Sequence, residues 1–313
     1  MSQNQQNGER KFHWAKQGEN KFLGKEIPRL DGIEKASGTA KYSADINTEG
    51  TLYAALLTCN IGHAKIASLD LTPAQNVKGV VVVHPFRQAG DELNWDGELI
   101  AAVAAERPEI AQEAVRTIKL QLEELEHFVQ DSDLEAAKQS DRASEGREAA
   151  KGNVEQALQN AKTVHKGHYG INMITHMCME PHGSHCERKD GKLVVHLSTQ
   201  NVSGTGGQFA EPLGVQESDV TVICNYVGGG FGSKFAADEW GLACAQMSKE
   251  AGRPVRLMLD RATELKTAGN RPSAFADITI AADAEGKIIA YDSHHWGTNG
   301  TRGSTINPTT MPY

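Results

Sequence analysis

The chain has 313 residues, which is the length of about two globular domains. Hydrophobic residues make up 39% and charged residues 23%, a composition that excludes wholesale disorder, a collagen-like fibre and a coiled coil. The net charge is −8, with nine acids against three bases between residues 122 and 150, so the charge gives no sign of the clustered Lys and Arg that a nucleic-acid surface needs.

The polar N-terminus, residues 1–21, lacks the apolar stretch of a secretory signal and predicts a frayed tail. The cytoplasm is therefore the default location, or the periplasm if a partner subunit carries the export signal. In residues 22–128 the apolar patterns predict a compact unit of alternating strands and helices. Its predicted strands are 51–59, 65–71, a buried 80–83, 99–105 and 119–125, and its predicted helices are 72–77 and 108–118.

The acidic segment, residues 129–152, predicts a solvated linker to a second region, residues 153–313. In that region the patterns predict helices at 154–161, 208–213 and 238–251, strands at 164–169, 192–198, 219–226 and 255–259, and a hairpin of 276–282 and 287–294. Residues 201–207 and 298–313 are expected to be loops. Few elements follow the hairpin, so the second region is expected to be incomplete.

Five cysteines are present, and none forms a C-x-x-C pair. Zinc ribbons and cysteine-ligated iron–sulfur clusters are therefore not expected on this chain, and any cluster would lie on another subunit. The odd count argues against a disulfide framework, and free thiols suit a reducing compartment.

Glycine is the one unusual residue type, because the chain has 31 against about 22 at an ordinary usage of ~7%. Four of them fall in the run Gly228-Gly229-Gly230-Phe231-Gly232, between a predicted strand and a predicted helix. Glycine lets backbone N–H groups approach a ligand closely, and a helix N-terminus favours an anion. The run predicts a loop for an anionic cofactor, with a tight structural turn as the alternative. It is not a Walker loop, because its spacing differs and Phe235 replaces Ser or Thr.

A histidine-rich segment, Thr175–Gly183, is the second candidate site. His182 and His185 are three residues apart, a spacing that metal sites use. The proline and glycine of the segment interrupt any helix that would align the two histidines, so structural hydrogen bonding in a turn is the favoured interpretation. Gln200, which follows the predicted strand 192–198, offers an amide to a pocket, with an ordinary surface position as the alternative.

Several motifs occur in a specific order along the chain. They are His176-Met177-Cys178-Met179-Glu180-Pro181-His182-Gly183, then Ser198-Thr199-Gln200, then Val227-Gly228-Gly229-Gly230-Phe231-Gly232-Ser233-Lys234. This order resembles the molybdenum-binding subunit of the xanthine dehydrogenase and aldehyde oxidase family. Upstream, residues 38–45 and 63–66 resemble its a/b hammerhead domain. The resemblance covers about residues 22–311 and implies an α+β fold, with a hammerhead domain at 22–128 and the first half of a molybdopterin-binding domain at 153–313.

The resemblance implies roles for single residues. Gly229, Gly230, Phe231 and Gly232 would wrap a molybdopterin and its metal, and in bacterial members the pterin usually carries a cytosine dinucleotide. Gln200 would hydrogen-bond an oxo group of the molybdenum, and no side chain of this chain would bind the metal directly. The family hydroxylates a carbon of an aldehyde or an N-heterocycle. Its electrons leave through two 2Fe–2S clusters to FAD, here expected on partner subunits.

Two departures from the family pattern bear on function. Purine-oxidising members have a glutamate directly after the lysine that ends this loop, where Phe235 stands here, so an aromatic or apolar substrate is expected, with Phe235 in its pocket. The catalytic glutamate of the family lies near the C-terminus of a considerably longer subunit, so no catalytic residue is expected in this chain. Glu180 belongs to a motif where the family places structure, and it is not a candidate for the base.

The leading prediction is therefore the cofactor-binding N-terminal portion of a molybdopterin-dependent hydroxylase subunit, inactive on its own. Its expected partners are a complementary second half of the subunit, an iron–sulfur subunit and an FAD subunit. Two rivals are a pterin- or nucleotide-binding fragment without catalysis, and a metal-dependent hydrolase that uses the histidine-rich segment. The reading frame after Tyr313 would distinguish a truncation from a natural split.

Overall fold

The computed structural model describes residues 16, 18–128, 130, 133–140, 146 and 148–297. The chain divides into two units, residues 1–40 and residues 41–313. The first unit contains helix α1 (Gly32–Ser37), which ends at Gly38 in the left-handed conformation that glycine adopts without strain. The loop predicted at 298–313 and most of the tail predicted at 1–21 lie outside the described residues.

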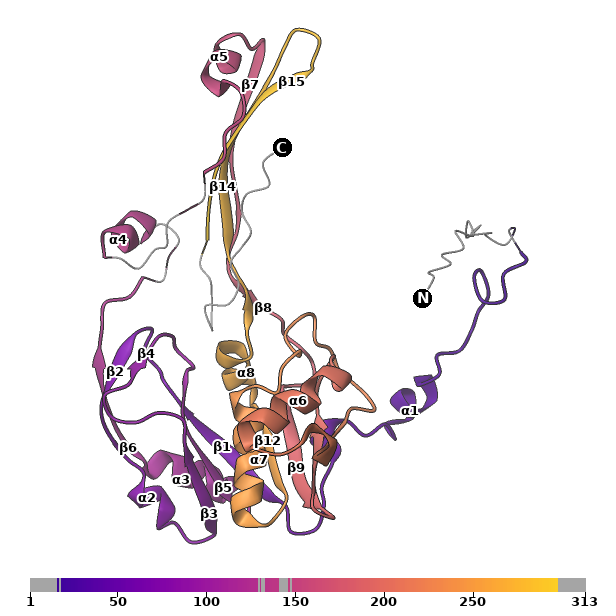
Figure 1. Ribbon diagram of the computed structural model, residues 1–313, viewed down its shortest axis with the longest axis vertical. Helices are drawn as coiled ribbons and strands as arrows, with labels where there is room; N and C mark the ends of the chain where they lie inside the picture. Colours follow the sequence, from indigo (N-terminus) through magenta and orange to yellow (C-terminus); the bar gives the residue numbers. More distant parts are fainter. Residues whose placement is uncertain are drawn as a thin grey trace, which may run out of the picture. The chain divides into compact units, whose positions relative to one another are not determined.

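The second unit is built on a seven-stranded sheet with the strand order β11-β10-β9-β12-β1-β5-β3 (Figure 1). Its strands are β1 (Leu52–Thr58), β3 (Val80–Pro85), β5 (Leu99–Ala105), β9 (Gly183–Lys189), β10 (Lys192–Leu197), β11 (Val220–Ile223) and β12 (Val255–Met258). β1 and β12 run parallel, with Leu52 opposite Val255. Strands of the two predicted regions, 22–128 and 153–313, therefore lie in one sheet. The domain boundaries at 22, 128 and 153 stay predictions.

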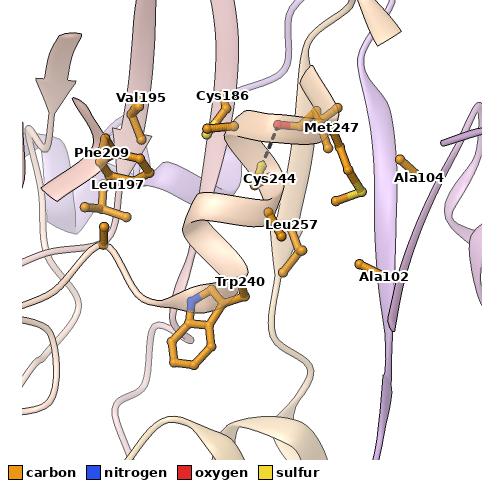
Figure 2. Packing of buried hydrophobic residues seen from close by; sticks show 14 of the residues in the cluster. Ala102, Ala104, Cys186, Val195, Leu197, Phe209, Trp240, Cys244, Met247 and Leu257 are labelled. Carbon is orange, nitrogen blue, oxygen red and sulfur yellow. Dashed lines mark hydrogen bonds between the residues drawn. The ribbon is translucent and has the colours of Figure 1, made fainter. Parts of the chain in front are cut away.

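The largest core lies against this sheet and includes residues of helices α6 (Val202–Leu213) and α7 (Glu239–Ala251). Trp240, Cys244 and Met247 of α7 are buried, and they lie in one cluster with Leu257 of β12 (Figure 2). Every residue of β5 is buried, which is typical of a strand that is covered on both faces. Removal of this apolar surface from water is the main contribution to the stability of the unit.

A second sheet, β4-β2-β6, covers a smaller core that includes Ile66 and Leu93. Its strands are β2 (Ala64–Asp70), β4 (Glu92–Leu93) and β6 (Lys119–Glu124). Three helices contact the large sheet: η1 (Ser43–Asp45) contacts β9, and α2 (Thr72–Gln75) and α3 (Pro108–Thr117) contact β3. Helix α3 begins at Pro108, whose fixed φ suits the first turn. Its Ala114 packs with Val103 of β5, which attaches this helix to the large sheet.

A third sheet, β7-β14-β15, joins segments that are more than a hundred residues apart, since His168 pairs across it with Asp277. Its strands are β7 (Thr163–Ile171), β14 (Ala274–Ala282) and β15 (Ile288–Trp296), and β8 (Ile174–Thr175) pairs separately with β13 (Asn270–Arg271). The remaining helices are α4 (Leu134–Gln139), α5 (Val154–Gln159), α8 (Arg261–Thr267) and η3 (Glu217–Asp219). Among the residues that the structure describes, no helix combines the length and the apolar character needed to span a bilayer.

Most predicted elements are confirmed, with ends that differ by a few residues. The loop predicted at 201–207 is wrong, because these residues form the first half of α6. Their glycines and hydroxyl side chains are poor helix formers, but Thr205 and Phe209 are buried, and tertiary packing decides the conformation of such a segment. Helix α4 lies within the predicted acidic linker and buries none of its residues.

Two strand predictions also need correction, and one strand was not predicted. The segment 183–189 was not predicted as a strand, and it forms β9, between β10 and β12 in the sheet. The strand predicted at 219–226 ends at Ile223, five residues before the glycine run. The strand predicted as buried at 80–83 lies at the edge of the sheet, where Val81 is 41% exposed.

Candidate functional site

The candidate site forms where β10 ends, beside the glycine loop, residues 228–234. Ser198, Thr199 and Gln200 follow the last residue of β10. The backbone N–H of Gln200 donates to the carbonyl oxygen of Lys234 at 3.0 Å, and the hydroxyl of Thr199 donates to the same oxygen at 3.1 Å. The structure therefore brings together the two segments that the sequence predicted as separate candidates.

The side chain of Gln200 is fixed by the loop. Its Oε1 accepts hydrogen bonds from the backbone N–H of Gly232 at 3.0 Å and of Lys234 at 3.3 Å. These two donors identify Oε1 as the buried end of the amide, so Nε2 is the end that faces away. No described residue accepts a hydrogen bond from Nε2. Gln200 thus offers an unused N–H pair to a ligand, as expected of a group that donates to an oxo or phosphate oxygen.

The glycine loop leaves a row of unused donors. Among the described residues, none accepts a hydrogen bond from the backbone N–H groups of Gly229, Gly230 or Phe231. Gly229 and Gly232 have φ angles of 107° and 102°, a backbone conformation that glycine adopts without strain. Successive unpaired N–H groups in such a turn form an anion-binding concavity. The donor set therefore fits an anionic cofactor such as a molybdopterin.

Phe231 holds an unfavourable backbone conformation at the loop. Its φ is 51°, which is rare for a bulky residue, and its side chain is 73% exposed. A Cβ on Gly229 would lie 2.9 Å from the Phe231 ring, so the ring packs directly over that glycine. A strained, exposed aromatic residue of this kind is characteristic of functional sites, where the surrounding structure maintains the strain.

Phe235, predicted in the substrate pocket, lies at the end of the same loop and is 51% exposed. Its carbonyl oxygen accepts a hydrogen bond from Nδ2 of Asn201 at 3.1 Å, which ties it to the start of α6. Its role in a substrate pocket stays a prediction.

Beneath the loop lies a buried ion pair that the sequence interpretation missed. Lys234 is 1% exposed, and its Nζ donates to the Glu180 carbonyl oxygen at 2.7 Å and to Oγ of Ser198 at 2.6 Å. Oε2 of Glu180 lies 3.5 Å from the same Nζ and accepts the backbone N–H of Gly228 at 2.6 Å. The two ends of the glycine loop are therefore attached to one buried charge pair.

A second buried pair supports the loop from α8. Nδ1 of His182 donates to Oε1 of Glu264 at 2.8 Å, the His182 backbone N–H donates to Oε2 at 2.8 Å, and Nε2 contacts the Ser233 carbonyl oxygen at 3.2 Å. Burial by itself would raise the pKa of Glu264, but the hydrogen bonds and charge of His182 outweigh it and lower that pKa. The hydroxyl of Ser233 also donates back to the Gly230 carbonyl oxygen at 2.8 Å.

The histidine-rich segment is used for structure in two different places. His182 contacts Glu264 and the loop, whereas His185 lies in β9 and contacts the hydroxyls of Thr48 and Thr51. Burial lowers the pKa of His185. The part of the chain that the structure describes holds no cluster of three His, Cys, Asp or Glu arranged to bind a metal. Both histidines hydrogen-bond other residues, as the favoured interpretation expects, although His185 lies in a strand and not in a turn.

The helix predicted at 238–251 is confirmed as α7, but it does not follow the glycine loop directly. α7 begins at Glu239, seven residues after Gly232, so its N-terminus does not supply the anion site that the sequence suggested. The unpaired N–H groups of the loop itself and the amide of Gln200 supply it. Sequence patterns gave no signal for Lys234, because its partners Glu180 and Ser198 lie 54 and 36 residues away.

Two family matches cover most of the chain. Residues 136–313 match the molybdopterin cofactor-binding domain, and residues 37–88 match the a/b hammerhead domain of aldehyde oxidase and xanthine dehydrogenase. The nicotinate dehydrogenase large molybdopterin subunit of Eubacterium barkeri is 29% identical over 90% of this chain and 72% of its own length. The xanthine dehydrogenase/oxidase of Mus musculus is 30% identical over 91% of this chain and 23% of its own length.

Solved structures share the fold. Quinoline 2-oxidoreductase from Pseudomonas putida 86 superposes with a TM-score of 0.75 at 21% identity, over 87% of this chain and 39% of its own. CO dehydrogenase from Oligotropha carboxidovorans gives a TM-score of 0.75 at 20% identity, with the same coverage. The chain spans less than half the length of these structures. The predicted resemblance is confirmed: this α+β chain belongs to the xanthine dehydrogenase and aldehyde oxidase family of molybdopterin-binding oxidoreductases.

Proposed function

We propose that this chain is the cofactor-binding N-terminal portion of a molybdopterin-dependent oxidoreductase subunit that hydroxylates a carbon of an aldehyde or an N-heterocycle. Family membership supports the cofactor, and relatives named for nicotinate and xanthine support this substrate class. The observation that carries the proposal is the cradle of unused donors formed by the Gly229, Gly230 and Phe231 N–H groups together with Nε2 of Gln200.

In this function the residues of the chain bind and orient, and they do not transfer the proton. The backbone N–H groups of the loop and the Gln200 amide would hold the anionic oxygens of the cofactor in a fixed position. The Phe231 ring, exposed above Gly229, would exclude water from one side of the site. When bound, the molybdenum–pterin group supplies the two-electron oxidation that inserts a water-derived oxygen into a C–H bond.

The rest of the machinery belongs to other polypeptide segments in this proposal. The base is a glutamate outside residues 1–313, so a complementary second half of the subunit completes the site. The pterin carries a cytosine dinucleotide, and 2Fe–2S clusters and FAD on partner subunits accept the electrons. Phe235 contributes an apolar wall for an aromatic substrate, in place of the polar group that a purine requires.

Of the two rival functions, the metal-dependent hydrolase has less support. Its proposed ligands point to different partners, since His182 contacts Glu264 while His185 contacts Thr48 and Thr51. The other rival, a binding fragment without catalysis, would use the same donor groups to hold the cofactor. It differs from the leading proposal only in predicting no turnover by the complete assembly.

The decisive experiment is metal and pterin analysis of the chain, purified with its native partners. We expect about one molybdenum and one pterin per chain, and turnover of an aldehyde or N-heterocycle only in the complete assembly. Molybdenum and pterin without turnover would favour the binding fragment. Zinc without pterin would overturn the proposal in favour of the hydrolase, and turnover by the isolated chain would overturn the placement of the base.

A further inference from the structure

We infer that Lys234 is a positioning residue: its buried ammonium group sets the orientation in which Gln200 offers its amide N–H to the cofactor. The inference rests on the proposed function. It concerns a residue that touches neither the proposed cofactor cradle nor solvent with its side chain, since Lys234 is 1% exposed.

The ammonium is surrounded by acceptors that match its chemistry. An ammonium carries three N–H donors. Nζ has three oxygen neighbours, namely the Glu180 carbonyl at 2.7 Å, Oγ of Ser198 at 2.6 Å and Oε2 of Glu180 at 3.5 Å. Two of the donors are therefore used in short hydrogen bonds, and the charge is paired with the Glu180 carboxylate at a site where an unpaired charge would be costly. A neutral side chain of the same length fills the space but satisfies none of these oxygens.

The backbone of Lys234 transmits this anchoring to Gln200. The Lys234 N–H donates to Oε1 of Gln200 at 3.3 Å, and the Lys234 carbonyl accepts the Gln200 backbone N–H at 3.0 Å and the Thr199 hydroxyl at 3.1 Å. One residue thus contacts both the main chain and the amide oxygen of Gln200. With the ammonium anchored, Oε1 is directed inward and Nε2 outward.

Glu180 depends on the same ammonium. Its Oε2 holds the Gly228 N–H at 2.6 Å, while its Oε1 is buried and has no hydrogen-bond partner among the described residues. Without Lys234 the carboxylate would remain buried next to the loop with its charge uncompensated. The end of the glycine loop at Lys234 would then lose its side-chain anchor, and its start at Gly228 would be held by an unpaired buried charge. An amide released from the loop is free to rotate and present Oε1, which repels an anionic oxygen.

The test compares Lys234→Met with the double variant Glu180→Gln/Lys234→Met in the native assembly. The single change leaves a buried carboxylate unpaired, and it is expected to destabilise the fold. The double change removes both charges and keeps an acceptor for the Gly228 N–H, so its thermal midpoint is expected within about 5 °C of the wild type. Lys192→Met, which removes an exposed lysine at the start of β10, is the matched control.

In the double variant we expect molybdenum per chain or kcat to fall roughly 10- to 100-fold, the range for residues that orient metal-site groups. We also expect a changed electron paramagnetic resonance signal of the paramagnetic molybdenum state. Lys192→Met should match the wild type in all three measurements. If the double variant folds with wild-type molybdenum content, kcat and signal, the inference is overturned. Wild-type protein without molybdenum would instead overturn the proposed function.

A second comparison separates positioning from general support. If Lys234 acts through Gln200, adding the double change to Gln200→Ala should lower kcat little further, because the amide is already absent. Gln200→Ala and the variant that combines it with the double change should then give the same electron paramagnetic resonance signal. If the fold-decrease in kcat of the combined variant equals the product of the two separate fold-decreases, Lys234 acts independently of Gln200. That result would overturn the inference.

Discussion

Gly230 and Gln200 are fitted so closely that a Cβ on Gly230 would lie 2.5 Å from Oε1 of Gln200 and 2.8 Å from its Cδ. The φ angle of Gly230 is not positive, so space and not backbone conformation requires the glycine. The same Oε1 accepts two N–H groups of the loop. The loop therefore closes around the amide oxygen and leaves the amide nitrogen outside.

Gly230→Ala is expected to displace the Gln200 amide without unfolding the chain. The atoms that the new methyl group meets belong to the end of a flexible side chain, so we expect a cost of about 1–3 kcal/mol in the free energy of unfolding. Molybdenum content or turnover should fall by roughly 10-fold or more, because Nε2 loses its orientation. Metal analysis and thermal unfolding of the same samples measure the two effects separately.

The control is Gly241→Ala in the buried core of α7. Its Cβ would meet the ring of Phe209 at 3.5 Å, an ordinary contact, and alanine favours a helix interior over glycine by about 1 kcal/mol. This variant should keep its stability and its molybdenum. Equal molybdenum content in the two alanine variants would contradict the importance of the close fit at Gly230.

Gly228→Ala is expected to lower the stability of the fold, in contrast to Gly230→Ala, whose main effect is on the Gln200 amide. Its Cβ would lie 2.4 Å from Cβ of Glu180, and neither atom can move freely, because the backbones of the two residues are joined by the Glu180 N–H to Gly228 carbonyl bond at 3.2 Å. We expect at least roughly 1–3 kcal/mol of lost stability. The midpoint of thermal unfolding should fall even in protein that holds no cofactor. An unchanged midpoint would contradict this packing.

Phe231→Ala should separate stability from activity. The side chain is 73% exposed, so the free energy of unfolding is expected to change by no more than about 0.5 kcal/mol. Turnover of the assembled enzyme should be lost, because the ring covers one side of the proposed site. Ile288→Ala, at a 64% exposed position of β15, is the matched control and should keep full turnover. Normal turnover by the Phe231 variant would contradict the assignment of the loop.

The sequence predicts elements well where apolar residues mark them and poorly where polar residues are buried. β5, with seven buried apolar residues in a row, is recognised at once. β9 reads Gly-Ser-His-Cys-Glu-Arg-Lys, and its buried Ser184 and His185 give no apolar alternation, so it was missed. The start of α6 was missed for a related reason, since its glycines disfavour a helix that only the burial of Thr205 and Phe209 stabilises.

The candidate site shows the same division. Gln200 and Phe231 stand in local motifs, from which the sequence predicts both as site residues. Lys234 and Glu264 act through partners 54 and 82 residues away, and these contacts exist only once the sheet is assembled. Composition and spacing contain no trace of such pairs, because each lysine or glutamate by itself resembles a surface residue.

Glu264→Gln should change how stability depends on pH. The pKa of Glu264 is lowered from its usual value of about 4.5, so its contribution is present above that value and is lost as the pH falls below it. At neutral pH, removing one partner of this buried pair should cost roughly 3–5 kcal/mol. The difference in stability between wild type and variant should therefore shrink as the pH falls from about 4.5 toward the folded pKa.

Glu285→Gln, in the exposed turn between β14 and β15, is the control and should leave the pH dependence unchanged. Urea unfolding at a series of pH values measures both, and a constant difference across acid pH would contradict the lowered pKa of Glu264.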